Sequence, residues 1–197
     1  MIGNQSSKKP IWRSKYVLWF FLMLPGLLFT IGVFNGKMTY NSLMHSTGEF
    51  SARFLIFSLI ASPLVLMFQG KKFTKWLLRN RRYFGVAAFA YGLYHTVAYL
   101  VEIPMDKILS EYFQFGMLTG WIAMIIWIPM AITSTDGMVR RLKGNWQQLH
   151  NLTYIAALMV VLHWSFLHYH WKPALVHFVP VLLLQVYRFF KIRKNNC

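Results

Sequence analysis

Seven histidines stand out in a chain that has few other residues able to hold a metal or a cofactor. They are His45, His95, His150, His163, His168, His170 and His177. An imidazole nitrogen is a strong ligand for iron, zinc and copper, and the second ring nitrogen can be fixed by a hydrogen bond. The single cysteine, Cys197, cannot build an iron–sulfur cluster or a thiolate site. Ligation by histidine is therefore the chemistry that the composition favours.

The composition indicates that these histidines are carried by helices in a membrane. Hydrophobic residues make up 56% of the 197 positions and charged residues only 13%. Six apolar runs are each near the ~20 residues that a helix needs to cross a bilayer. They cover 16–34, 50–68, 83–101, 115–132, 148–167 and 174–190. We therefore expect an all-α, polytopic transmembrane bundle of about six helices.

The basic residues indicate how this bundle is oriented. The net charge is +16, and most of the 21 Lys and Arg residues lie near the two termini and in two of the segments between apolar runs. The positive-inside rule predicts that these segments and both termini are cytoplasmic. Because the charges alternate with apolar spans, we do not expect nucleic-acid binding. The expected organisation is a cytoplasmic segment 1–15, a six-helix transmembrane domain 16–190 and a cytoplasmic tail 191–197.

Depth in the membrane separates the histidines into different candidate sites. At about 1.5 Å per residue, His150 and His163 lie roughly 20 Å apart along one helix, so one haem cannot use both. His95 and His163 lie at similar depth on two helices, where two imidazoles can bind one iron from opposite faces. Such ligation fills both axial positions, which suits electron transfer rather than oxygen binding. We expect an outer b-type haem between His95 and His163.

His150 is a candidate ligand with several open interpretations. It lies at the inner mouth of the fifth expected helix, which we place from about 148 to 167. It could bind a second, inner haem, contact a haem propionate, or cap its helix. Arg82, and not a histidine, stands thirteen residues before His95. An inner haem therefore has no obvious second ligand.

Two further candidates lie near the start of the second expected helix. His45 is either near the outer haem or an interfacial residue beside a helix N-cap formed by Ser46 or Thr47. Arg53 stands four residues after Glu49, a spacing typical of an ion pair on a helix, but it could instead meet a haem propionate.

Other functions remain open at this point. His168 and His170 form a His-x-His pair that could hold a surface metal, as in a transmembrane ferric or cupric metalloreductase. A haem-free transporter or structural subunit, with its histidines bonded to neighbouring hydroxyls, is a third hypothesis. We expect His177 to be a packing residue.

Several segments resemble the MsrQ family, also called YedZ, within the ferric-reductase-like transmembrane proteins. The most specific is the run Trp-Gln-Gln-Leu-His-Asn at 146–151. The other matching residues are Thr133, Ser134, Thr135, Arg140, His163, His45, Thr47, Gly48, Pro63, Arg81, Arg82, Gly85 and His95. The resemblance covers nearly the whole chain.

The resemblance implies an electron-transfer subunit in the bacterial inner membrane, without a substrate-reducing domain of its own. The residues that match the family's haem ligands are His95, His150 and His163, for one or two haems b. The implied acceptor is MsrP, a periplasmic molybdenum enzyme that repairs methionine sulfoxide in oxidised proteins. The implied donor is quinol or a cytosolic flavin reductase, and FMN is sometimes assigned to the family. The chain has no Gly-x-Gly loop, so a nicotinamide domain would belong to a partner.

Overall fold

The computed structural model describes residues 14–167 and 171–195, and over these residues its regular elements are helices. Six helical segments are long and apolar enough to cross a membrane, if α7 and α8 are counted as one. The spans are α1 (Lys15–Phe34), α2 (Tyr40–Met67), α3 (Lys72–Glu102), α5 (Phe115–Ile132), α7 (Gly144–Asn151) with α8 (Thr153–Leu167), and α9 (Trp171–Asn195). Two short helices, α4 (Met105–Glu111) and α6 (Asp136–Leu142), join spans. The expected all-α bundle of six spans is confirmed, whereas its orientation stays a prediction.

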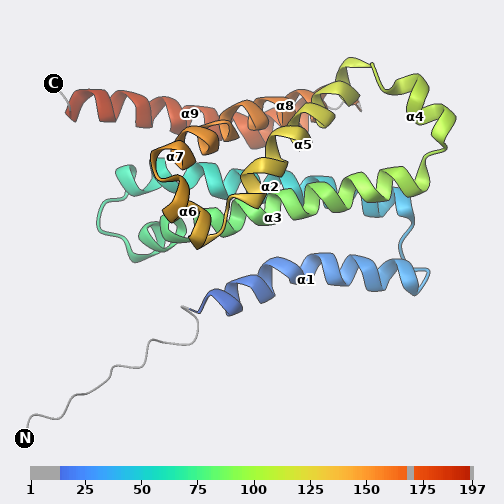
Figure 1. Cartoon of the computed structure of the whole chain (residues 1–197), viewed down its shortest axis with the longest axis horizontal. Coiled ribbons are helices and arrows are strands. Elements are labelled where there is room, and N and C mark those ends of the chain that lie inside the picture. The colour runs from blue at the N-terminus through green and yellow to red at the C-terminus, as the bar shows by residue number, and fades with distance from the viewer. Residues whose placement is uncertain (1–13, 168–170, 196–197) are drawn as a thin grey trace, which may run out of the picture.

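The spans are arranged as two closely packed pairs with two more peripheral helices. α2 packs along α3, α5 packs along α8, and α9 lies against α2 and α8. α1 contacts α2 and α3 from one side (Figure 1). The first residue of α1 and the last of α9 lie at the same end of the bundle as α6 and α7 (Figure 1). We call this the α6 end, and the opposite end, which carries α4, the α4 end.

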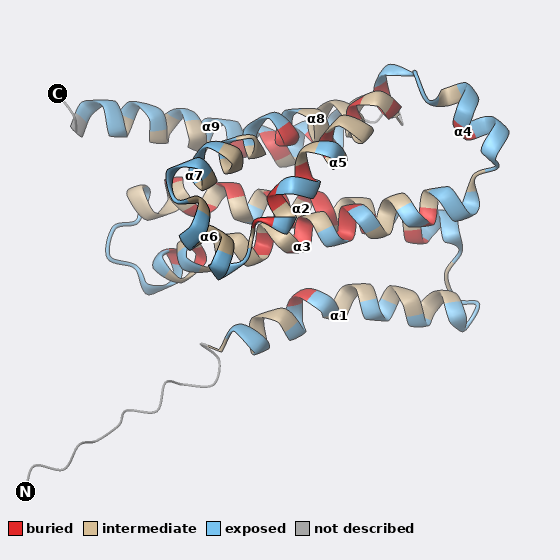
Figure 2. Ribbon diagram, in the orientation of Figure 1, coloured by how far each residue is buried: buried red, intermediate tan, exposed pale blue. Residues whose placement is uncertain are grey.

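Small residues bring α2 and α3 close together. Ala61 on α2 and Ala88 on α3 have no exposed surface, and Ser51 on α2 donates a hydrogen bond of 2.8 Å to the Ala88 carbonyl. In a membrane, small side chains and such hydrogen bonds let two helices approach and pack without a hydrophobic driving force. Most of the buried residues accordingly lie on the central helices rather than on α1 (Figure 2).

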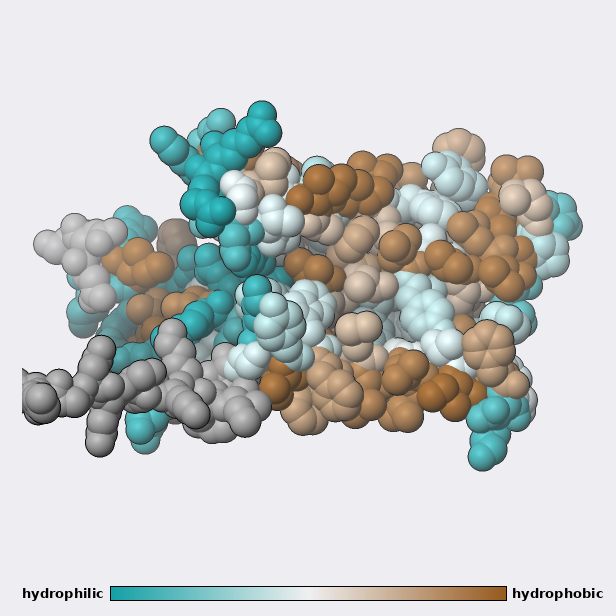
Figure 3. Space-filling view, turned by 60° about the horizontal axis from the view of Figure 1, so that its bottom comes forward, coloured by the Kyte–Doolittle hydropathy of each residue, from teal (hydrophilic) through white to brown (hydrophobic). Residues whose placement is uncertain are grey.

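The outer surface of the bundle is apolar, as lipid contact requires. Large side chains such as Phe20 on α1 and Leu182 on α9 are each 62% exposed. In the face drawn in Figure 3, hydrophobic side chains cover much of the length of the molecule, and hydrophilic ones gather toward the α6 end. This distribution supports the assignment of a multi-pass membrane protein.

The second helix begins earlier than its apolar run suggests. α2 starts at Tyr40, and its N-cap is Thr39, whose side chain accepts a hydrogen bond from the backbone N–H of Ser42. The predicted N-cap at Ser46 or Thr47 is therefore wrong. The Thr47 hydroxyl donates to the Leu43 carbonyl of its own helix at 2.8 Å, which satisfies this buried polar group inside the span.

The other differences also concern polar residues that extend helices. α3 begins at Lys72 rather than near position 83, because Lys and Arg are good helix formers and their charges stay outside the apolar part. The fifth span begins at Gly144 rather than near position 148 and is interrupted at Leu152. Lys143, with a φ of 49°, separates α6 from α7 and sets this early start.

The close α2–α3 packing generates a prediction with a control on the same helix. Ala88→Leu places three additional carbons where there is no exposed surface, and such overpacking costs about 1–3 kcal/mol. We expect thermal unfolding of the detergent-purified protein to occur several degrees lower than in the wild type. Ala90→Leu, on the exposed side of α3, should leave the unfolding temperature unchanged. Equal unfolding temperatures for the two variants would contradict this packing.

Candidate functional site

A cavity of about 430 Å³ lies between α2, α3, α5 and α8 at the α4 end. Residues of α4 line it as well, so that helix borders the cavity where the spans end. Its lining combines apolar side chains with several that can ligate or hydrogen-bond. The latter group includes His45, Glu49, His95, Tyr99, Trp121 and His163. The volume is within the range typical of sites for small molecules and cofactors.

The structure brings His95 of α3 and His163 of α8 together in this cavity. Their ring centroids are 6.1 Å apart, and the ring planes are nearly perpendicular, at 86°. The two residues are 68 positions apart in sequence and come from different helix pairs. The arrangement that their similar depth predicts is thus present as a close pair of imidazoles.

A backbone carbonyl and a glycine of α2 fix the position of His95. Its Nδ1 lies 2.7 Å from the carbonyl oxygen of Met44. Since a carbonyl only accepts, Nδ1 must be the protonated donor, and the lone pair that can bind a metal is on Nε2. Gly48, one helical turn after Met44, leaves room for the ring, because a Cβ there would lie 3.0 Å from Nδ1.

A backbone carbonyl and a glycine, here on α5, also fix the position of His163. Its Nδ1 lies 2.8 Å from the carbonyl oxygen of Gly116, which again assigns the lone pair to Nε2. Gly120 stands one turn after Gly116, and a Cβ there would lie 2.6 Å from Nδ1 of His163. In both cases, then, the carbonyl of one residue orients the ring and a glycine four residues later makes space for it.

The role of Gly120 in leaving room for the His163 ring was not predicted from the sequence. A glycine inside a helix costs roughly 1 kcal/mol relative to alanine, so its presence in a span is a signal of close approach by another group. That signal does not say which group approaches, because the partner is 43 residues away in sequence.

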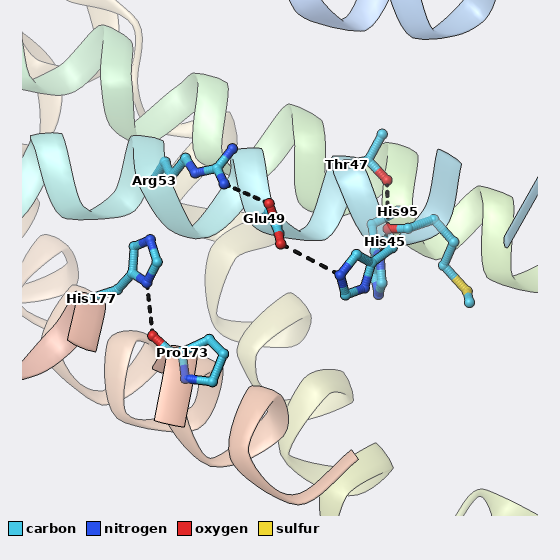
Figure 4. A network of polar contacts seen from close by, with 8 residues as sticks. His45, Thr47, Glu49, Arg53, His95, Pro173 and His177 are labelled. Carbon is cyan, nitrogen blue, oxygen red and sulfur yellow. Dashed lines mark hydrogen bonds and ion pairs between the residues drawn. The ribbon is translucent and has the colours of Figure 1, made fainter. Parts of the chain in front are cut away.

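His45 and Arg53 are both bonded to Glu49 on the same face of α2 (Figure 4). Nε2 of His45 is 3.4 Å from one carboxylate oxygen, and the Arg53 guanidinium is 2.5 Å from the other. Arg53 also lies over the Phe50 ring, 5.2 Å from its centroid. His45 and Glu49 line the cavity, whereas Arg53 is not among the described residues that line it.

His150 lies in a separate, smaller cavity of about 100 Å³ toward the α6 end. Its ring stacks on Trp146 with centroids 3.9 Å apart, and Nε2 is 3.2 Å from the Thr133 hydroxyl. The indole N–H of Trp146 donates to the Thr133 carbonyl at 3.0 Å. These contacts join the C-terminal end of α5, at Thr133, to α7, which begins the fifth span.

Two arginines line the cavity of His150 from α3. Arg81 donates to the Ser62 hydroxyl at 3.0 Å, and Arg82 forms an ion pair with Asp136 of α6. The Arg82 guanidinium lowers the pKa of the Asp136 carboxyl from its ordinary value. No second histidine is among the described residues of this cavity.

The remaining histidines lie outside both cavities or outside the described part of the chain. His177 bonds through Nδ1 to the Pro173 carbonyl at 2.7 Å and packs on Trp164, 5.3 Å between centroids (Figure 4). His168 and His170, the predicted surface metal pair, lie outside the described residues. Within residues 14–167 and 171–195, no group of three or more His, Cys, Asp or Glu side chains is arranged to hold a metal ion.

Comparison with known proteins identifies relatives along most of the chain. The family model described as ferric reductase like transmembrane component matches residues 47–161. A protein-methionine-sulfoxide reductase heme-binding subunit MsrQ from Herminiimonas arsenicoxydans is 33% identical in an alignment of 181 positions that covers 86% of this chain and 81% of the relative.

Two further proteins named heme-binding subunit MsrQ are similar to this chain. The one from Azospira oryzae is 31% identical over 173 residues, covering 83% of this chain and 72% of the relative. The one from Xanthomonas euvesicatoria pv. vesicatoria is 38% identical over 127 residues, covering 62% and 56%. No solved structure matches the chain.

The space that Gly120 leaves for His163 generates a second prediction. Gly120→Ala forces the ring away from its position, because the 2.6 Å separation is shorter than any ordinary contact, and the bond to the Gly116 carbonyl is lost with it. If the ring binds haem iron, haem per purified chain, measured as the pyridine haemochrome, should fall at least severalfold. Gly137→Ala, at a position with no atom near the added carbon, is the matched control and should retain its haem. Full haem content in both variants would show that the position of this ring does not matter.

Proposed function

The chain belongs to the MsrQ family of ferric reductase like transmembrane proteins, and we propose that it is the haem-binding electron-transfer subunit of a methionine sulfoxide reductase. The observation that carries the proposal is the pair of imidazoles, His95 and His163, which face one another inside a cavity of about 430 Å³. Each ring is held from α2 or α5 by a backbone carbonyl.

The spacing of the two rings fits one iron between them. A ring nitrogen binds a first-row metal at about 2 Å and lies about 1 Å from its own ring centre, so two imidazoles that held one metal ion would have centroids about 6 Å apart. The observed separation is 6.1 Å. The Nδ1 hydrogen bonds give both rings the tautomer whose Nε2 carries the lone pair, as a ligand to iron requires.

Haem b, when bound there, supplies a one-electron carrier that alternates between ferric and ferrous iron. The chain contributes ligation by His95 and His163, hydrogen bonds that keep both rings in place, and an apolar wall that includes Met117, Ala123 and Trp127. A wall of this kind limits access of water and raises the influence of nearby charges on the reduction potential. Ligation of the iron by both imidazoles would suit electron transfer rather than binding of oxygen.

In this proposal, the subunit passes its electrons to a partner protein, which uses them to reduce a sulfoxide. One methionine sulfoxide takes up two electrons and two protons and yields the thioether and one water, so the subunit must deliver two electrons in succession. We propose that the partner is an MsrP-like molybdenum reductase on the periplasmic side, near the α4 end. The protein then lies in the bacterial inner membrane with the basic α6 end and both termini in the cytoplasm, as the distribution of Lys and Arg supports.

We further propose that electrons enter at the α6 end, from quinol or a cytosolic flavin reductase. The cavity of His150, with Arg81 and Arg82 on its wall, lies on this side. A cationic wall there suits an anionic group such as a haem propionate or the phosphate of FMN. The chain is thus proposed to hold at least one haem, with His150 available for a second cofactor.

The proposed ligation generates a direct test on the purified protein. His163→Ala removes one of the two axial ligands, so we expect loss of most of the haem, or conversion of what remains from a low-spin to a high-spin visible spectrum. His177→Ala removes a histidine that is not among the residues lining the cavity, and its spectrum should match the wild type. Retention of a wild-type spectrum and haem content by His163→Ala would exclude this residue as a ligand.

A further inference from the structure

We infer that Tyr99 and Trp121 bind the propionate carboxylates of the haem, so that its polar edge points toward the α4 end. This inference rests on the proposed function, because it assumes that haem occupies the cavity of His95 and His163. It concerns two residues whose buried polar atoms have no hydrogen-bond partner within residues 14–167 and 171–195.

Both residues carry a buried polar atom that lacks a hydrogen-bond partner. Across the described part of the chain, the buried side-chain nitrogen and oxygen atoms without a partner are Oη of Tyr99 and Nε1 of Trp121. Both residues line the same cavity. Buried polar groups are nearly always satisfied in native proteins, so two orphan atoms on residues that line one cavity point to an occupant that supplies acceptors.

Tyr99 and Trp121 each lie close in sequence to one of the two histidines or to a residue that contacts it. Tyr99 is about one helical turn beyond His95 on α3, about 6 Å nearer the α4 end. Trp121 follows Gly120, the residue against which His163 packs, and its ring lies 6.0 Å from that of Tyr112 just before α5. The two donors therefore belong to the two helix pairs that carry the imidazoles.

The Tyr99 hydroxyl and the Trp121 indole N–H are hydrogen-bond donors that suit a carboxylate. An indole N–H can only donate, and a phenol donates strongly to an anionic oxygen. Haem b carries acceptor oxygens in its two propionates and nowhere else on the ring. A propionate is therefore the part of the cofactor that satisfies these donors.

The carboxylates that the protein places near the cavity do not compete for this role. Glu49 is bonded to His45 and Arg53, and Glu111 lies 4.0 Å from the Lys107 ammonium. Each of these acidic groups is balanced by a basic partner on its own helix. A bound propionate would then meet donors rather than uncompensated negative charge.

The test uses the haem-loaded protein in detergent and compares Tyr99→Phe and Trp121→Phe with the wild type. Haem loss is followed by transfer to an excess of apomyoglobin, and the midpoint potential by redox titration. Loss of a charge-assisted hydrogen bond should accelerate haem loss about tenfold or more. It should also lower the midpoint potential, because an uncompensated propionate stabilises ferric iron.

Tyr94→Phe is the matched control, since it removes a hydroxyl from the same helix that is bonded to Thr30 on α1, away from the cavity. It should change neither quantity. If the wild type holds haem but Tyr99→Phe and Trp121→Phe both release it at the wild-type rate with an unchanged potential, the inference is overturned and the two atoms bind water only. A wild type without haem would instead overturn the proposed function.

Discussion

The structure depends on one constraint, which is that an imidazole inside an apolar bundle must find both a polar partner and room for its ring. His95 and His163 meet this constraint in the same way, with Nδ1 bonded to a helix carbonyl and the ring packed against a glycine one turn later. Each solution requires two helices in close contact. The pairing of α2 with α3 and of α5 with α8 is therefore the arrangement that brings both oriented imidazoles to one cavity.

The two ends of the bundle differ in the chemistry that they offer. At the α4 end, the cavity of the paired imidazoles contains orphan donors and acidic groups balanced by basic ones. At the α6 end, arginines and a stacked Trp146–His150 pair surround a much smaller space. Such a division suits a protein that accepts electrons on one side of a membrane and releases them on the other, with the apolar spans holding the carriers between.

Much of this could be predicted from the sequence, because hydropathy and depth depend on local composition. The six spans, the similar depth of His95 and His163 and the separation of His150 from that pair all follow from run lengths and the rise of a helix. What could not be predicted depends on which helices are neighbours. The contact of Gly120 with His163 and the orphan atoms of Tyr99 and Trp121 are tertiary features, whereas the ion pair of Glu49 with Arg53 is local and follows from its spacing. The N-cap at Thr39 was not predicted, because the residues that extend α2 before its apolar run are polar.

We propose that His95 and His163 would hold one haem iron between them, and their nearly perpendicular ring planes predict a distinctive spectroscopic signature. Crossed imidazoles donate to different iron d orbitals and leave those orbitals nearly equal in energy. Low-temperature electron paramagnetic resonance of the oxidised protein should therefore give the highly anisotropic low-spin ferric signal of crossed ligands. A high-spin signal, or no ferric haem signal at all from intact protein, would contradict the account.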